Sequence, residues 1–222
     1  MKTIVVAASK GGVGKTTLTA SLAVEATHRG SVAIMDLDPQ QSLARWHDVR
    51  MSDDADSVPH LIEIGKRPEV AIARAKKQKL DWLFIDTPGG SLSRMKIAVD
   101  HADLVLIPAR PSPLDVESMG AIVELCELTG RPWAFIMNGV TPGSPMADGA
   151  RTYLQTRYGN LLNDEVQNRE AYASAMLGGT TAAELNNRDD AAIEIRKLWA
   201  TVERLAKNPV ELMHSGRKKS AS

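Results

Sequence analysis

Short apolar runs alternate with amphipathic stretches along most of the chain. The runs are rich in β-branched residues, whereas the stretches between them place apolar residues three and four positions apart. Alternation of this kind is typical of crossover units that build a parallel sheet. The pattern predicts strands at 3–8, 32–36, 61–64, 82–86, 104–108 and 133–138, and helices at 15–28, 42–49, 69–79, 92–98 and 116–129. We therefore expect an α/β fold with a doubly wound, mostly parallel sheet flanked by helices.

The pattern loosens after residue 138. Residues 139–149 are rich in Gly and Pro and predict a surface loop. Helices are expected at 150–158, 170–177 and 191–207, and the last segment, 208–222, is short and polar, as in a disordered tail. A chain of 222 residues can bury a full core, so we expect a single domain over 1–207 followed by this tail.

Composition narrows the classes of function. Lys and Arg together number 27, as do Asp and Glu, so any nucleic-acid surface must be a local basic patch. The single cysteine, Cys126, lies in an apolar helical stretch and by itself cannot build a disulfide, a zinc site or an iron–sulfur site. The apolar run 4–8 is too short for a membrane span or a signal-peptide core. We expect a cytoplasmic protein.

A glycine-rich segment follows the first predicted strand and opens the first helix. Its sequence is Ser9-Lys10-Gly11-Gly12-Val13-Gly14-Lys15-Thr16-Thr17. Glycines at such a turn let backbone N–H groups face a phosphate, and the helix N-terminus adds partial positive charge. Lys15 would neutralise the outer phosphates and the Thr16 hydroxyl would ligate Mg²⁺. Ser9 stands where the standard motif has a glycine, so the strict motif fails, and a plain glycine turn with two solvated lysines is the alternative.

The pattern that replaces the strict motif, Lys-Gly-Gly-x-Gly-Lys-Thr-Thr, resembles the deviant Walker A of the ParA/MinD family of ATPases. The resemblance implies a P-loop NTPase fold, ATP and Mg²⁺ as cofactors, and a homodimer in the ATP state. The residues that would bind the nucleotide are Gly11, Gly12, Val13, Gly14, Lys15, Thr16 and Thr17. In that family the early lysine, here Lys10, reaches across the dimer interface to the other subunit's phosphates, so Lys10 and Lys15 are both expected to be catalytic.

Aspartates follow two further predicted strands. Asp36 and Asp38 lie in the stretch Asp-Leu-Asp-Pro-Gln, which resembles the second motif of the family, and Asp86 ends an apolar run as in a Walker B strand. By position, Asp36 is assigned to the metal shell, Asp38 to the attacking water, and Asp86 to the magnesium ion, usually through water. The alternative for each is that it caps the following helix. The turn 87–90 resembles a switch that reports ATP against ADP.

Further matches extend the resemblance to about residue 185. Asn138 falls where family members hold the adenine with a strand-end asparagine. The stretch 104–115 is similar to one that lies near the family's dimer interface. Residues 168–172, followed by Gly178 and Glu184, resemble the C-terminal pattern of the short ParA proteins.

Two positions depart from the family's pattern. Arg110 stands where a small or apolar residue is common, and Ser9 where an amide side chain often precedes the early lysine. Neither departure removes a catalytic group, so hydrolysis is still expected. The details of the dimer interface are what these two residues leave open.

The resemblance implies a ParA-type ATPase that binds DNA nonspecifically as an ATP dimer and partitions plasmid or other cargo. Hydrolysis would be weak alone and stimulated by a ParB-like or cargo-adaptor protein, with the dimer associated with the nucleoid. DNA backbone binding needs clustered Lys and Arg. The candidates are Arg169, Arg188, Arg196, Lys197, Arg204 and Lys207, with a second group at 74–79; solvated helix faces are the alternative. For Arg169, bracing the dimer or pairing with a carboxylate stays equally open.

Other functions fit the sequence less well than a ParA-type ATPase. A MinD-like membrane-cycling ATPase would need a C-terminal amphipathic helix, but only Val210, Leu212 and Met213 could insert, so no membrane partner is expected. A dethiobiotin-synthetase-like ligase would need a dedicated substrate pocket, whereas the early lysine and the Asp-x-Asp-Pro-Gln stretch favour the dimeric switch. A nitrogenase iron-protein role is excluded because the cluster of that protein takes two thiolates per subunit, whereas this chain has only Cys126. A filament that binds ATP without hydrolysing it stays open.

Overall fold

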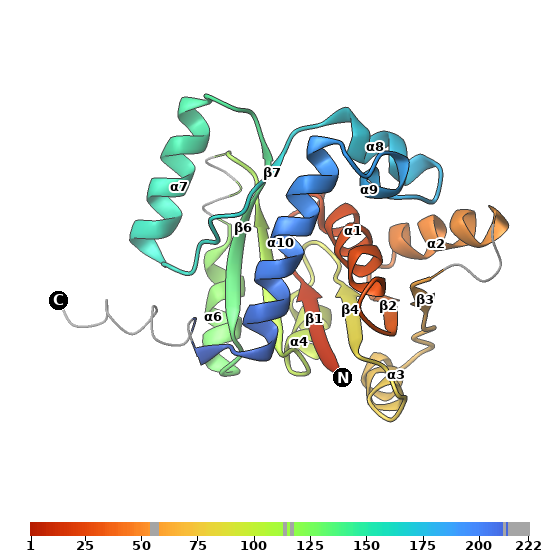
Figure 1. Ribbon diagram of the computed structural model, residues 1–222. Helices are drawn as coiled ribbons and strands as arrows, with labels where there is room; N and C mark the ends of the chain where they lie inside the picture. Colours follow the sequence, from red (N-terminus) through yellow and green to blue (C-terminus); the bar gives the residue numbers. More distant parts are fainter. Residues whose placement is uncertain (54–57, 113–114, 116–117, 211, 213–222) are drawn as a thin grey trace.

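The computed structural model describes residues 1–53, 58–112, 115, 118–210 and 212. Its centre is a seven-stranded sheet in the order β3-β2-β4-β1-β5-β6-β7, and all of its neighbouring strands are parallel (Figure 1). The strands are β1 (Lys2–Val6), β2 (Val32–Asp36), β3 (His60–Leu61), β4 (Trp82–Asp86), β5 (Leu104–Ala109), β6 (Trp133–Val140) and β7 (Val166–Gln167). This order confirms the doubly wound sheet, and it reverses at β1, where such folds bind their ligands.

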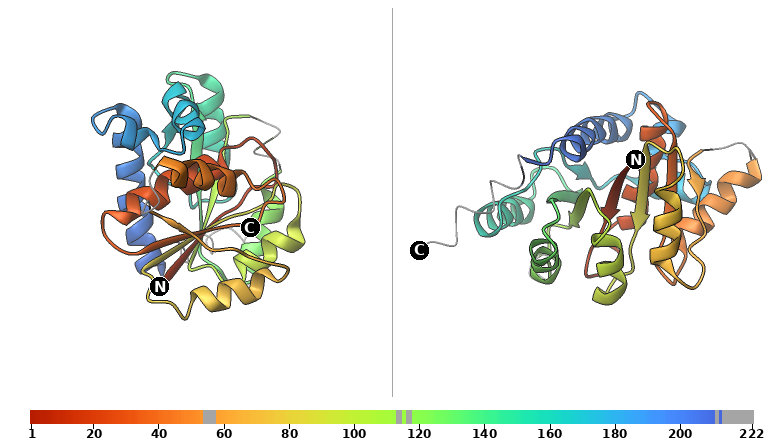
Figure 2. Two further views of the ribbon diagram at one scale, coloured as in Figure 1. Left: turned by 90° about the vertical axis from the view of Figure 1, so that its right-hand side faces the viewer. Right: turned by 90° about the horizontal axis from the view of Figure 1, so that it is seen from below.

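Helices cover both faces of the sheet (Figure 2). One face carries α1 (Lys15–Thr27), α2 (Ser42–Asp53), α8 (Glu170–Leu177), α9 (Ala182–Leu185) and α10 (Asp190–Lys207). The other carries α3 (Pro68–Ala75), α4 (Leu92–Val99), α6 (Gly120–Leu128) and α7 (Pro145–Arg157). Among the described residues, no helix combines the length and the apolar character needed to cross a bilayer.

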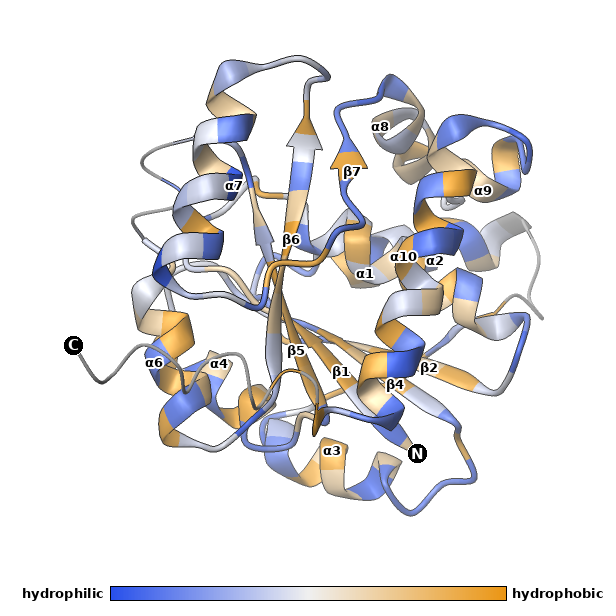
Figure 3. Cartoon of the chain, turned by 60° about the vertical axis from the view of Figure 1, so that its left-hand side comes forward, coloured by the Kyte–Doolittle hydropathy of each residue, from blue (hydrophilic) through white to orange (hydrophobic). Residues whose placement is uncertain are grey.

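Alternate residues of each central strand bury against opposite helix layers. In β1, Ile4 and Val6 belong to the core on the α1 side, whereas Val5 belongs to the core on the α4 side. Because both faces are covered, the central strands are mostly apolar, as Figure 3 shows for β1, β2, β4 and β5. Trp199 of α10 is fully buried between Trp82 and Phe84, with ring centroids 4.8 and 5.7 Å away. This contact fixes α10 across the strands that flank the site.

Several predicted boundaries are wrong. The loop expected at 139–149 ends early, because α7 begins at Pro145, and proline suits the first helical position, where no N–H is required. The strand expected at 61–64 is only His60–Leu61, and the helix expected at 69–79 ends at Ala75. The helix expected at 116–129 spans Gly120–Leu128 in the described residues, with 116 and 117 outside them. The elements β7 and α9, of two and four residues, are absent from the predicted set.

The start of the predicted tail packs onto the domain. Leu212 is buried in the core on the α1 side, together with residues of α10 such as Leu205. Residues 211 and 213–222 of the predicted tail lie outside the described residues. Of the apolar residues near the C-terminus, Leu212 therefore contributes to folding, and Val210 is exposed.

Candidate functional site

The phosphate loop joins β1 to α1 at the centre of the sheet. Gly12 and Gly14 have φ of +77° and +90°, a conformation that side chains rarely adopt, and Gly14 precedes the first turn of α1. Lys15 is 6% exposed, and its Nζ donates to the carbonyl oxygen of Lys10 at 3.0 Å. The loop therefore curls around its own lysine, beside a helix N-terminus that favours anions.

The turn 87–90 packs against this loop. A Cβ added at Gly89 would lie 3.0 Å from the backbone nitrogen of Gly11 and 3.1 Å from the carbonyl carbon of Lys10. The buried Thr87 hydroxyl donates to the carbonyl of Val6 at 3.0 Å. Glycine at position 89 allows this close approach, so a movement of the turn would displace the phosphate loop directly.

Thr16, in the first turn of α1, meets Asp86 at the carboxyl end of β4. The Thr16 hydroxyl donates to Oδ2 of Asp86 at 2.6 Å. Asp86 is 1% exposed, and among the described residues its Oδ1 has no hydrogen-bond partner. Burial raises the pKa of Asp86 to about 7, opposed by the Thr16 hydrogen bond and assisted by the charge of Asp36. A magnesium ion fits here, because a hydroxyl and an unpartnered carboxylate oxygen are the hard donors that it prefers.

Asp36 ends β2 and Asp38 follows it, and the two carboxylates differ in what they bind. One oxygen of Asp36 accepts the N–H of Asp38 at 2.9 Å, and the other accepts those of Leu43 and Ala44 at 2.9 and 3.0 Å. Asp36 thus caps α2, which is the alternative left open by the sequence. Asp38 lines the cleft above the loop, and its Oδ1 accepts the N–H of Gln40 at 2.9 Å. The metal role of Asp36 stays a prediction, and it would act through water because both oxygens are engaged.

Lys10 lies at the mouth of the loop, where its side chain is 40% exposed. Its Nζ is 3.6 Å from Oδ1 of Asp115, in the stretch predicted to lie near a dimer interface. The hydroxyl of Ser9 lies 2.8 Å from the Ser118 hydroxyl and 3.0 Å from the Ser118 carbonyl oxygen. Ser9, one of the two departures, therefore holds the loop to the segment that follows β5. The action of Lys10 across a dimer stays a prediction.

Two clefts meet over the loop. The larger, of about 740 Å³, is lined by Gly11, Gly12, Gly14, Lys15, Thr16, Thr17, Asp38, Gln40, Ser42, Arg45, Trp46, Val49, Gly89, Arg110, Met176 and Leu177. The smaller, of about 170 Å³, lies between β6 and α8 and includes Asn138, Arg169 and Tyr172. Gly14, Thr17 and Arg110 line both. A nucleotide laid over the start of α1 would extend from the larger cleft into the smaller one.

Asn138 connects β6 to the phosphate loop. Its Nδ2 donates to the carbonyl oxygen of Val13 at 2.6 Å, and a side chain at Gly14 would collide with it. The asparagine therefore shapes the loop and at the same time lines the smaller cleft. Its predicted contact with adenine stays a prediction.

Arg169 is paired with carboxylates, which is one of the three roles that the sequence left open. Its Nε and Nη2 donate to Oε1 of Glu194 at 2.9 and 2.7 Å, and its Nη1 lies 3.3 Å from Asp190. The Tyr172 hydroxyl donates to the other oxygen of Glu194 at 3.0 Å. These contacts tie the start of α8 to α10 beside the smaller cleft. A contact of Arg169 with DNA stays a prediction, and it would compete with this pairing.

The remaining candidates for DNA contact gather on and beside α10. Arg188, Arg196, Lys197 and Arg204 are exposed. Two acidic side chains of the same helix are largely turned away from solvent, since Glu194 and Glu203 are 14% and 13% exposed, and Glu203 binds Arg29 and Lys207 at 2.8 Å. Asp190, at the start of the helix, is 70% exposed but lies 3.3 Å from Arg169. Figure 3 shows hydrophilic segments alternating with hydrophobic ones along α10. The acidic residues that would dilute this basic surface are therefore partly neutralised by other contacts.

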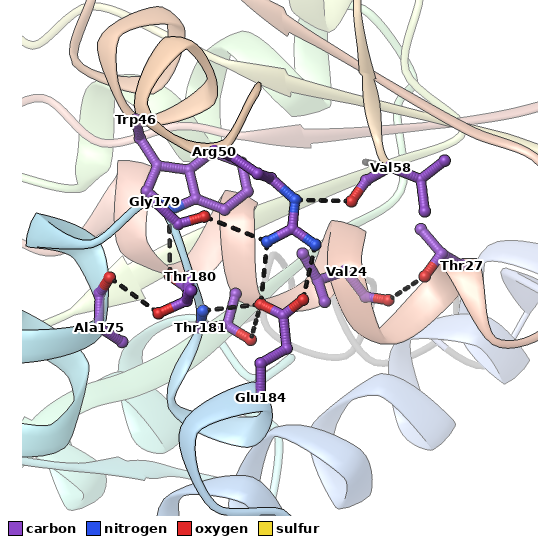
Figure 4. Close-up of polar contacts among 10 residues, drawn as sticks. All are labelled: Val24, Thr27, Trp46, Arg50, Val58, Ala175, Gly179, Thr180, Thr181 and Glu184. Atoms are coloured by element: carbon purple, nitrogen blue, oxygen red, sulfur yellow. Dashed lines mark hydrogen bonds and ion pairs between the residues drawn. The ribbon is translucent and has the colours of Figure 1, made fainter. Parts of the chain in front are cut away.

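Arg50 joins α2 to the segment between α8 and α9 (Figure 4). Its guanidinium donates to both oxygens of Glu184 at 3.0 and 2.6 Å, to the Gly179 carbonyl at 3.1 Å and to the Val58 carbonyl at 2.8 Å. It also lies 5.4 Å from the ring centre of Trp46. Sequence reasoning missed this cluster, because Arg50 and Glu184 are 134 positions apart and no local spacing connects them. The cluster holds α2, and with it Asp38, in place against the C-terminal half.

We expect Arg50→Ala to lower the free energy of unfolding by about 1–2 kcal/mol, because it removes the hydrogen bonds of the guanidinium and leaves the partly exposed Glu184 carboxylate without its charged partner. Burial favours a raised pKa for Glu184, but the hydrogen bonds and charge of Arg50 outweigh it and lower that pKa. The stabilisation is therefore complete above the unfolded pKa and is lost as pH falls through the folded pKa. Urea titrations at pH 7 and under acidic conditions measure both effects. Arg45→Ala, on the same helix, should change stability by less than about 0.5 kcal/mol, and equal losses for both variants would contradict the assignment.

Comparisons with known proteins place this site in a family. The family model of the CobQ/CobB/MinD/ParA nucleotide binding domain matches residues 4–208. The chain is 30% identical over 216 residues to Protein ParA of Rhizobium radiobacter, covering 90% of this chain and 95% of that protein. It is 29% identical over 203 residues to Maintenance of carboxysome distribution protein A of Halothiobacillus neapolitanus, covering 88% and 94%.

A solved structure shows the same fold. The septum site-determining protein MinD from Pyrococcus horikoshii, complexed with Mg-ADP, superposes with a TM-score of 0.71 at 20% identity, over 92% of this chain and 97% of that one. The P-loop NTPase fold expected from the sequence is thereby confirmed. The matched region runs from the first strand to the end of α10 and includes every element of the phosphate site, so the chain belongs to the CobQ/CobB/MinD/ParA nucleotide-binding family.

Proposed function

We propose that this protein is a ParA-type positioning ATPase that forms a dimer with ATP and Mg²⁺, binds DNA nonspecifically in that state and releases it on hydrolysis. The observation that carries the proposal is the juxtaposition of three features at the point where the sheet order reverses. These are the buried Lys15 inside the phosphate loop, the Thr16–Asp86 pair beside it, and Lys10 at the exposed mouth. A monomeric phosphate-binding enzyme would have no need for a second lysine, Lys10, at the exposed mouth of the loop.

The nucleotide would be held by the backbone and side chains of the loop. Lys15 is positioned to exchange the Lys10 carbonyl, now 3.0 Å away, for terminal phosphate oxygens. Thr16 and Asp86 would hold Mg²⁺, which neutralises phosphate charge when bound. Asp38 would orient the attacking water, and Asp36 supports it by accepting the Asp38 N–H at 2.9 Å. Asn138 would hold the adenine from the smaller cleft.

Dimerisation would redirect Lys10. Its present contact with Asp115 spans 3.6 Å between partly exposed groups, and ion pairs of this kind contribute at most about 1 kcal/mol. The triphosphate of a second subunit offers more negative charge and better geometry for hydrogen bonds. Exchange of Asp115 for that triphosphate would therefore be favourable, and it would make the dimer depend on ATP.

The DNA surface would be the exposed side of α10 together with Arg188, which lies two residues before the helix begins. Lys197 and Arg204 are seven positions apart and so lie on one helix face, with Arg196 and Arg188 nearby. Contacts to phosphates alone carry no sequence preference, which suits a protein that binds DNA of any sequence. A protein working this way would be found on the nucleoid.

By analogy with the named relatives, the cargo would be a plasmid or another cellular assembly. One of these relatives is a ParA protein and the other is a protein that maintains carboxysome distribution. For this chain we propose that a ParB-like or cargo-adaptor protein stimulates a hydrolysis rate that is weak without it. Membrane cycling is less well supported, since Leu212 is buried in the core rather than available for insertion.

The DNA step predicts binding to duplexes of unrelated sequence that is stronger with ATP than with ADP and weakens as salt rises. The double variant Lys197→Ala, Arg204→Ala should weaken binding evenly across sequences and reduce the slope of log K against log salt by about 2. Fluorescence anisotropy with two unrelated duplexes at several salt concentrations measures this. The comparison variant is Lys77→Ala, Lys79→Ala, from the second candidate group, just after α3, and it should leave the slope unchanged if α10 carries the DNA surface. A sequence-selective interaction, or a larger loss in the comparison variant, would contradict the assigned surface.

A further inference from the structure

Arg110 is the one departure from the family's pattern that faces the site. It follows β5 directly, and β5 lies between β1, which leads into the phosphate loop, and β6, which carries Asn138. Its guanidinium therefore leaves the sheet between the two parts of the nucleotide site. Arg110 also lines both the larger and the smaller cleft.

Gly139 leaves space for the Arg110 side chain. The side chain passes over Gly139, where a Cβ would lie 3.5 Å from Arg110 Nε and 3.9 Å from its Cγ. Gly139 has φ of +69°, so a side chain there would be strained as well as crowded. Glycine at this position keeps the path of the arginine clear.

Arg110 differs in its partners from the other arginine of the smaller cleft. Arg169 is held by Glu194 and Asp190, as described above. Among the residues that the structure describes, no hydrogen bond or ion pair engages the guanidinium of Arg110. An exposed cation without a carboxylate partner, at the rim of a cleft built for phosphate, raises the local concentration and the affinity of anionic ligands.

The position of the two clefts identifies the part of the ligand that meets Arg110. Lys15 and Thr16 line only the larger cleft, Asn138 only the smaller, and Gly14, Thr17 and Arg110 line both. Lys15 and Thr16 take the terminal phosphates in a loop of this type. The part of the nucleotide that crosses over Gly14 and Thr17 is then the phosphate attached to the nucleoside.

We propose that Arg110 binds the α-phosphate of a nucleotide held by its own subunit, an inference that rests on the proposed nucleotide-dependent function. A guanidinium presents several N–H donors in one plane, which suits the oxygens of a phosphate group. Because ADP and ATP share the α-phosphate, Arg110 contributes to the affinity for both, and its contribution does not require the dimer. Lys10, in contrast, acts only when a second subunit is present.

The test compares the wild type with Arg110→Ala and Arg110→Lys by calorimetric titration of ADP in the presence of Mg²⁺. Arg110→Ala should weaken ADP and non-hydrolysable ATP analogues by similar factors of about 10 to 100, the loss of one or two charge-assisted hydrogen bonds. Arg110→Lys keeps the charge without the planar fork and should lose less. Arg74→Ala, an exposed arginine in the last turn of α3 that lines neither cleft, is the control and should bind normally.

The two diastereomers of ADP with sulfur at the α-phosphate give a readout that a structural role would not move. The wild type should prefer one diastereomer, and Arg110→Ala should lose much of that preference. Unchanged ADP affinity, or an unchanged diastereomer preference, overturns the proposal. A loss confined to ATP in the dimer assigns Arg110 to the neighbouring subunit and overturns it as well. If the wild type binds neither ADP nor ATP, the proposed function itself fails.

Discussion

Lys15→Ala is expected to abolish measurable ATP binding, and the ATP-dependent dimer with it. Lys15 is 6% exposed and its ammonium already lies inside the loop, 3.0 Å from the Lys10 carbonyl, so little rearrangement is needed to reach phosphate. Each charge-assisted hydrogen bond to a terminal phosphate contributes about 1.5–3 kcal/mol, so affinity should fall at least about 100-fold. Isothermal titration with ATP and Mg²⁺ measures the first effect, and light scattering with and without ATP measures the second.

The control for this variant separates a local loss from a loss of fold. Lys96→Ala removes a lysine of α4 that pairs with Asp100 at 2.6 Å on the surface, and it should bind ATP as the wild type does. The nucleotide-free Lys15→Ala protein should unfold cooperatively at a temperature close to that of the wild type. Retention of ATP affinity within about threefold would show that the loop does not hold phosphate through Lys15.

The central strands and the phosphate loop could be predicted from the sequence, because each depends on residues that are close together along the chain. The strands 32–36 and 82–86 coincide with β2 and β4, since both are continuous apolar runs that end in aspartate. The phosphate loop could be predicted for a similar reason. Its glycines, its lysines and the start of the helix that follows lie within nine consecutive residues, and two of those glycines have the positive φ that such a turn needs.

Features that depend on distant residues could not be predicted in this way. The two-residue strand β7 forms because Val166 and Gln167 pair with Asn138 and Val140 of β6, not because of any periodicity of their own. The pairing of Arg169 with Glu194 depends on how α8 meets α10. Spacing along the chain carries no information on such contacts, and for this reason the sequence alone leaves three alternative roles open for Arg169.

For the three aspartates of the site, position at the end of a strand predicts where the carboxylate lies but not what it does. Asp36 ends β2, Asp86 ends β4 and Asp38 comes two residues after β2, and Asp36 and Asp86 occupy paired positions of these two strands. Only hydrogen bonding distinguishes them. The carboxylate of Asp36 accepts hydrogen bonds from three backbone N–H groups. Asp86 keeps a buried oxygen without a partner among the described residues. Asp38 accepts the N–H of Gln40 with one oxygen at the cleft.

This difference makes Asp38 the better candidate for the attacking water, and it predicts a separation of two activities. Asp38→Ala should still bind ATP and dimerise, because Lys10, Lys15 and Thr16 are intact. Its rate of phosphate release should fall at least about 100-fold, the usual contribution of a group that positions or deprotonates a nucleophile. The ATP-bound dimer would then accumulate, and light scattering would detect a dimer that persists after the wild type has returned to monomer.

Asp38→Asn is the matched variant that separates charge from turn geometry. Asparagine keeps an oxygen for the Gln40 N–H, a contact now 2.9 Å long that itself contributes only about 1 kcal/mol. If the carboxylate charge orients or activates water, Asp38→Asn should hydrolyse ATP as poorly as Asp38→Ala. If the asparagine variant instead hydrolyses at the wild-type rate, Asp38 serves only to shape the turn after β2. The attacking water would then be held by another group at the cleft, and the structure offers Gln40, which lines the same surface, as the next candidate to replace.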